Sequence, residues 1–168
     1  MKKPVFFLAC CCLLLSCAKK APQTAESPTQ HISGEDEGLN QISREARESF
    51  PEFARKLSNP GPDEGDFRVK YPFEAEPGSA FGYEHIWLED IFIEDGRYYG
   101  TVSSRPYYIS SLQAGDIVPF EKNLISDWMY IKAGQIVGGR SVQYLIKQIP
   151  EPDWDEETRA VYRMFDPD

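Results

Sequence analysis

Residues 83–102 read YEHIWLEDIFIEDGRYYGTV, and they contain the two strands around which the rest of the chain can be arranged. In the first half, apolar or aromatic-ring side chains occur at both odd and even positions. The odd positions hold His85, Trp87, Ile91 and Ile93, and the even ones hold Ile86, Leu88 and Phe92. A strand that is apolar on both faces is typical of a central position in a sheet. Asp95-Gly96 is a strong two-residue hairpin signal, so the chain is expected to return antiparallel through Arg97 to Val102.

The flanking sequence predicts further strands. Between Phe67 and Phe73, apolar residues alternate with Arg68 and Lys70, which indicates a half-buried strand. Three more short strands are expected, at Ile117 to Phe120, Leu124 to Lys132 and Gln135 to Val137, the last two as a hairpin around Ala133-Gly134.

Helices are predicted on both sides of this region. An apolar stripe indicates a helix from about Gln41 to Leu57, which either kinks at Pro51 or is followed by a second helix capped by Ser49. Val142 to Ile149 fits a short helix, with a strand as the alternative, and a last helix follows Asp153. Together these patterns predict an α+β fold: an antiparallel sheet of about five strands with helices packed on one face.

The N-terminus predicts export and lipidation. Lys2 and Lys3 precede an apolar run that is too short to span a bilayer, which is the layout of a secretory signal. The run ends in Leu14-Leu15-Ser16-Cys17, which resembles the lipobox of bacterial lipoproteins. An ordinary signal or an uncleaved anchor is the alternative, whereas cleavage before Cys10 would leave too short an apolar segment.

These features divide the chain into four parts: a signal peptide (1–16), a lipidated Cys17 with a flexible tether (17–40), one α+β domain (41–150) and an acidic C-terminal helix (151–168). The expected membrane contact is the lipid on Cys17. Because Ala18 is not the aspartate associated with inner-membrane retention, we expect the outer membrane, facing the periplasm.

Charge and cysteine content exclude several functions. The chain has 18 basic and 27 acidic residues; without Lys2 and Lys3 the net charge is 16 − 27 = −11, so nucleic acid is not an expected partner. Of the four cysteines, three would leave with the signal and Cys17 would carry lipid. The folded domain would then have no disulfide and no cysteine nucleophile or metal ligand.

The middle of the chain carries several short motifs in order: Glu84-His85-Ile86-Trp87, Gly100, Pro106, Gly115-Asp116, Ile125-Ser126-Asp127-Trp128-Met129 and Gly138-Gly139. In these motifs the chain resembles the YegJ-like bacterial domain of unknown function, family number 2314, over roughly Ile42 to Ile149. The final acidic helix lies outside that match. The resemblance implies a small bacterial domain but no reaction, because the family has no established activity to carry over.

Catalytic candidates are few. His85 is the only histidine of the expected domain, and Asp127 could orient it as a general base for Ser126 or Ser141, with Glu84 nearby in sequence. No Gly-x-Ser-x-Gly elbow supports this hypothesis. No Asp-x-Asp-x-Asp loop or histidine pair indicates a metal, and no cofactor is expected.

Aromatic residues favour binding instead, because tyrosine and tryptophan are enriched at recognition surfaces. The binding candidates are Trp87, Tyr107, Tyr108, Trp128 and, beside the double glycine, Arg140. We therefore expect a noncatalytic module of the bacterial envelope whose partner is a protein or another envelope component; an immunity-like inhibitor of a basic partner is one form of it. The alternatives are an envelope hydrolase using His85 and Asp127, and a structural lipoprotein.

Overall fold

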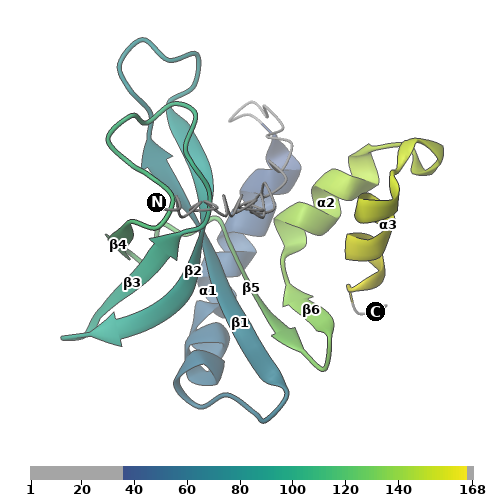
Figure 1. Cartoon of the computed structure of the whole chain (residues 1–168), viewed down its shortest axis with the longest axis horizontal. Helices are drawn as coiled ribbons and strands as arrows, with labels where there is room; N and C mark the ends of the chain where they lie inside the picture. Colours follow the sequence, from purple (N-terminus) through teal and green to yellow (C-terminus); the bar gives the residue numbers. More distant parts are fainter. Residues whose placement is uncertain (1–35, 166–168) are drawn as a thin grey trace, which may run out of the picture.

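The computed structural model describes residues 36–165, which form an α+β fold with a six-stranded sheet (Figure 1). The elements in chain order are α1 (Glu37–Ser58), β1 (Glu64–Glu74), β2 (Tyr83–Glu94), β3 (Arg97–Val102), β4 (Ile117–Phe120), β5 (Asp127–Lys132), β6 (Gln135–Gly138), α2 (Arg140–Gln148), the 3-10 helix η1 (Glu151–Asp153) and α3 (Glu156–Arg163). The predicted signal peptide and most of the predicted tether lie outside the described residues.

The sheet has the order β4-β3-β2-β1-β5-β6, and every pair of neighbouring strands is antiparallel. The predicted class and strand direction are confirmed, with six strands where about five were expected. β1 and β2 occupy the two central positions. Asp95 and Gly96 both have positive φ (49° and 75°), as the predicted hairpin turn requires.

A bulge changes the parity of β2 halfway along. The register of β2 with β3 shifts between Glu89 and Phe92, and Asp90 has a φ of 49°. Ile91 consequently joins Ile86 in the core, and the next residue, Phe92, is exposed. The predicted grouping of Ile91 with His85 and Trp87 was therefore wrong, because an unpaired residue reverses the alternation.

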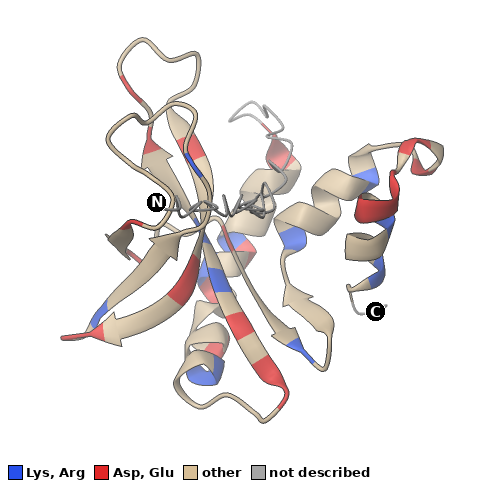
Figure 2. Cartoon of the chain, in the orientation of Figure 1, with Lys and Arg blue, Asp and Glu red and all other residues tan. Residues whose placement is uncertain are grey.

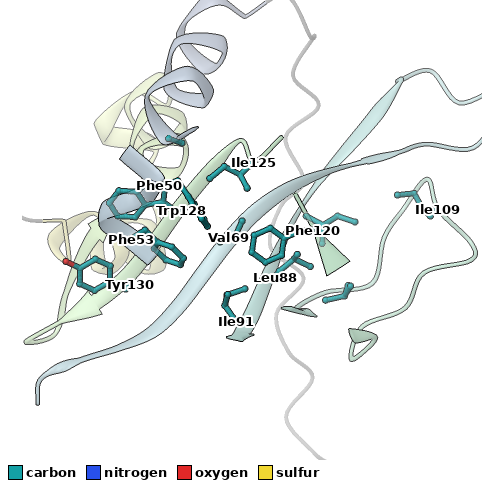
Figure 3. Close-up of a cluster of buried hydrophobic side chains, with 13 residues drawn as sticks. Phe50, Phe53, Val69, Leu88, Ile91, Ile109, Phe120, Ile125, Trp128 and Tyr130 are labelled. Atoms are coloured by element: carbon teal, nitrogen blue, oxygen red, sulfur yellow. The ribbon is translucent and has the colours of Figure 1, made fainter. Parts of the chain in front are cut away.

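Helix α1 covers one face of the sheet and forms the main core with it. Phe50 and Phe53 point from α1 toward Trp128 and Val69 (Figure 3), and the rings of Phe53 and Trp128 lie 5.5 Å apart. The helix is continuous through Pro51 and begins at Glu37, four residues before the predicted start. The side chain of Asp36 caps it by accepting the Leu39 N–H at 3.0 Å.

The C-terminal helices pack on residues of the opposite parity at the β5–β6 end of the sheet. Ile136 of β6, Ile146 of α2 and Phe165 form a second core cluster, against which Met129 and Ile131 of β5 pack. The helices therefore do not all lie on one face, as the sequence patterns had suggested, because alternate residues of β5 are apolar on both sides. α2 confirms the predicted short helix. Asp155, rather than the predicted Asp153, caps α3 by accepting the Thr158 N–H at 2.7 Å.

Acidic residues occur on most elements and are frequent in the segment that contains η1 and the start of α3 (Figure 2). Within residues 36–165, no helix combines the length and apolar character needed to cross a membrane.

Two glycines with the same φ of +81° allow a matched test of the packing between β5 and β6. A Cβ at Gly138 would lie 2.3 Å from the Trp128 carbonyl oxygen, whereas a Cβ at Gly134 would meet nothing within 4 Å. Gly134→Ala should cost only the left-handed backbone penalty, about 1–2 kcal/mol. Gly138→Ala should lower the free energy of unfolding by about 1–3 kcal/mol more than Gly134→Ala does, because it also overpacks the core. Urea unfolding measures both, and equal losses would contradict the packing described.

Candidate functional site

Five polar residues meet where β1, β2, β5 and the start of α2 come together: Lys70, His85, Ser126, Asp127 and Ser141, hereafter the polar cluster. Lys70 is paired in register with Trp87 of β2 and with Asp127 of β5. Directly opposed residues point to the same side of a sheet, so these three side chains share the face opposite α1.

Asp127 caps helix α2 from a neighbouring strand. Its Oδ2 accepts the Ser141 N–H at 2.7 Å and its Oδ1 accepts the Trp128 N–H at 2.8 Å. The N-cap residue of α2 is Gly139, which has no side chain, so the carboxylate supplies the missing acceptor. Asp127 is 2% exposed, and this burial raises its pKa against the opposing effects of its hydrogen bonds and of Lys70. Its role in the fold is therefore structural.

His85 contacts Ser126, not Asp127. Its Nδ1 lies 2.9 Å from Ser126 Oγ, and that hydroxyl donates to the Lys70 carbonyl oxygen at 3.1 Å. Because a carbonyl can only accept, the serine proton is directed to Lys70, and we assign the Nδ1 proton to His85 as donor. Nδ1 then cannot deprotonate Ser126, and Nε2 is left as an acceptor.

The imidazole is held neutral. Partial burial of the ring, followed by the charge of Lys70, lowers the pKa of His85 from 6.5 to about 4, although the residue still has exposed surface. Both candidate nucleophiles are poorly accessible, because Ser126 is 6% exposed and Ser141 4%. The predicted arrangement of Asp127, His85 and a reactive serine is thus not assembled by this geometry.

Lys70 was not among the sequence-predicted site residues. Its Nζ lies 3.4 Å from Ser141 Oγ and 5.6 Å from the centre of the Trp87 ring. Burial lowers the pKa of Lys70, and the nearby Asp127 charge opposes that shift. The only signal in the sequence was a lysine on the polar side of an alternating strand, which is ordinary for a half-exposed strand.

Glu84 anchors a loop and takes no part in the polar cluster. Its carboxylate accepts the Tyr107 N–H at 2.9 and 3.0 Å and the Tyr108 N–H at 2.8 Å. Successive residues of a strand point to opposite faces, so Glu84 and the tyrosine loop lie on the side away from His85. Tyr107 is 59% exposed there, while the Tyr108 ring packs against Phe81.

The remaining binding candidates divide between core and surface. Trp128 is 8% exposed and belongs to the core, where its Nε1 donates to Ser49 Oγ at 3.1 Å, so it is not a surface residue. Arg140 is exposed at the start of α2 and forms an ion pair with Glu45. Trp87 is partly exposed on the side of the polar cluster.

One side of the central strands is left open by the described helices. We call it the uncovered face and define it by Lys70 and Pro72 of β1 and Tyr83, His85 and Trp87 of β2. These residues pair in register, Pro72 with His85 and Lys70 with Trp87. Tyr83 is 60% exposed and His85 is also exposed, so the aromatic residues of β2 reach solvent on this side.

Two open hollows of the described residues lie away from the polar cluster. One, of about 470 Å³, lies beside α2 and β6, and the other, of about 480 Å³, lies near the β2–β3 turn and β4. Within residues 36–165, no group of three or more His, Cys, Asp or Glu side chains is placed to hold a metal ion. Within the cluster, Ser126, Asp127 and Ser141 are buried, whereas Lys70 is partly exposed and His85 is exposed.

An α+β fold whose antiparallel sheet has one open, aromatic face defines a structural class of small domain, and it does not define an activity. The chain belongs to the family described as an uncharacterized protein conserved in bacteria, domain of unknown function 2314 (DUF2314), whose model matches residues 36–161. The match includes most of the C-terminal helix, so the prediction that this helix lies outside the family was wrong.

Two curated bacterial proteins are similar to the chain. The uncharacterized protein YegJ of Escherichia coli K12 is 28% identical over 120 residues, which cover 71% of this chain and 74% of YegJ. A putative ankyrin repeat protein of Neisseria meningitidis serogroup B is 28% identical over 139 residues, which cover 80% of this chain but only 55% of that protein. No solved structure matches the chain.

The capping role of Asp127 predicts a graded loss of stability. Asp127→Ala leaves two buried N–H groups without an acceptor and should lower the free energy of unfolding by about 2–4 kcal/mol. Asp127→Asn keeps one acceptor oxygen and should lose less. The matched control is Asp155→Ala, which removes an exposed cap and should cost about 1 kcal/mol. If urea unfolding gives Asp127→Ala no larger effect than Asp155→Ala, the assigned role is wrong.

Proposed function

We propose that this protein is a noncatalytic binding module that a lipid on Cys17 holds at the bacterial envelope, with the uncovered face as its binding surface. The observation that carries the binding role is that Tyr83 and His85 are exposed, and Trp87 partly exposed, on one open side of a central strand. Large aromatic side chains left accessible on one face of a domain are typical of recognition surfaces.

The polar cluster supports a binding role over a catalytic one. A general base must reach the proton it removes, and His85 Nδ1 already donates to Ser126. A nucleophile must reach its substrate, and both serine hydroxyls are buried beneath the face. The network instead fixes the orientation of the His85 ring and the position of Lys70, which gives the face a fixed set of polar groups.

The anchor is supported by the sequence of the N-terminus. Leu14-Leu15-Ser16-Cys17 ends an apolar run of signal-peptide length, and several acyl chains on one cysteine suffice for stable membrane attachment. We place the protein at the outer membrane, facing the periplasm, because Ala18 follows the cysteine.

The anchor predicts that one cysteine alone controls membrane attachment. In cells fed an alkyne analogue of palmitate, the wild-type chain should carry the label and sediment with membranes. Cys17→Ser should abolish the label, because it removes the acylated thiol. Cys12→Ser is the matched control, since Cys12 lies in the predicted signal and should not alter labelling. Labelling that survives Cys17→Ser would contradict the proposal.

The binding surface predicts position-specific crosslinking in intact cells. A photoreactive benzoylphenylalanine at position 83 should form an adduct with an envelope component, because Tyr83 is 60% exposed on the uncovered face. The same group at position 107 is the control, because Tyr107 is 59% exposed on the opposite side. Trp87→Ala should reduce the adduct at position 83. Equal adducts at both positions, or none at position 83, would contradict this binding surface.

A further inference from the structure

The uncovered face has the spacing of a surface for an extended ligand. Tyr83, His85 and Trp87 alternate along β2, so neighbouring members of the row are about 7 Å apart. Pro72 and Lys70 lie directly beside His85 and Trp87 on β1. Because the row runs along an exposed stretch of the strand, the surface suits a ligand that lies along it.

The polar groups on this row form a neutral acceptor and a donor beside an aromatic ring. Partial burial and the Lys70 charge lower the pKa of His85 to about 4, so the ring is neutral at pH 7, and with Nδ1 donating to Ser126 its Nε2 can accept a hydrogen bond. Lys70 is partly exposed, and its Nζ, 3.4 Å from Ser141 Oγ and beside the Trp87 ring, has further N–H groups with which to donate to a ligand at that end of the row.

This combination matches a sugar. A hydroxyl group both donates and accepts, so it can bond to Lys70 and to His85, while the C–H face of a pyranose ring can stack on the negative face of an indole. A polysaccharide repeats these groups along its length, as the aromatic row does.

Two other ligand classes fit less well. A peptide that adds a strand pairs at a sheet edge, here residues 71–74 of β1 or 83–86 of β2, which lie beyond the ladders with β5 and β3, and it would not lie across the row of rings. The net charge of −9 opposes a polyanion, and Lys70 is the only cationic residue among the five that define the face.

We infer that the uncovered face binds an uncharged polysaccharide chain, with Trp87 and Tyr83 as stacking platforms and His85 and Lys70 as hydrogen-bonding partners of sugar hydroxyls. This inference rests on the proposed binding function and names its ligand class.

The test is calorimetric titration with two hexasaccharides, chitohexaose and cellohexaose. The full chain is extracted from membranes of the producing bacterium in lauryldimethylamine oxide, a detergent without a sugar headgroup. Wild type should bind at least one hexasaccharide saturably. Trp87→Ala should weaken binding about tenfold by removing a stacking ring, and His85→Phe should weaken it about fivefold by removing the acceptor while keeping an aromatic ring. Tyr107→Ala is the control on the opposite side and should bind as wild type.

Tyr83→Ala keeps the test informative if Trp87→Ala fails to fold, because Tyr83 is exposed and contributes little to the core. Binding that neither variant weakens, or no binding of either hexasaccharide at millimolar concentration, would overturn the inference. The crosslinking experiment separates the two levels. A protease-sensitive adduct at position 83 without hexasaccharide binding would leave the binding surface standing and reject the sugar, whereas loss of both results would reject both proposals.

Discussion

The buried carboxylate of Asp127 ties the C-terminal half of the chain to the sheet. It ends the loop that enters β5 and accepts the N–H of Ser141 on α2, so one charge fixes the strand and the start of the helix together. The partial positive charge of a helix N-terminus favours a carboxylate there, which compensates part of the cost of burying it. The position of α2 in turn places Ser141 next to Lys70.

The charges of the polar cluster act on one another over short distances. Asp127 favours the ammonium form of Lys70, and Lys70 disfavours the imidazolium form of His85. The charge of Lys70 thus adds to the larger effect of partial burial in keeping the His85 ring neutral. Ser126 completes the arrangement by bonding to His85 and to the Lys70 backbone, so each polar side chain is held by a neighbour from another element.

Local signals in the sequence predicted most of the fold. The Asp95-Gly96 turn and the alternation in β1 identified the central hairpin, because a turn and a strand face depend on neighbouring residues. The bulge at Asp90 escaped prediction because both parities of β2 are apolar, which hides a change of register. The prediction that all helices pack on one face of the sheet was wrong for a different reason. Which face each helix covers depends on the pairing of β5 and β6 with the rest of the sheet, and that pairing joins residues far apart in the chain.

The candidate site was only partly predictable, for a related reason. His85, Ser126 and Trp87 were singled out by residue type, but the contact between His85 of β2 and Ser126 before β5 depends on how distant segments pair. Asp127 was interpreted as a catalytic partner because the sequence does not reveal that α2 starts beside it. The N-cap residue of that helix is a glycine, so the Asp127 carboxyl group serves as the cap. Glu84 likewise gains its role only from a loop more than twenty residues away. A histidine, a serine and an aspartate in one domain therefore do not by themselves make a triad, because here the Asp127 carboxyl group accepts from the start of α2, His85 contacts Ser126 instead, and both serine hydroxyls are buried.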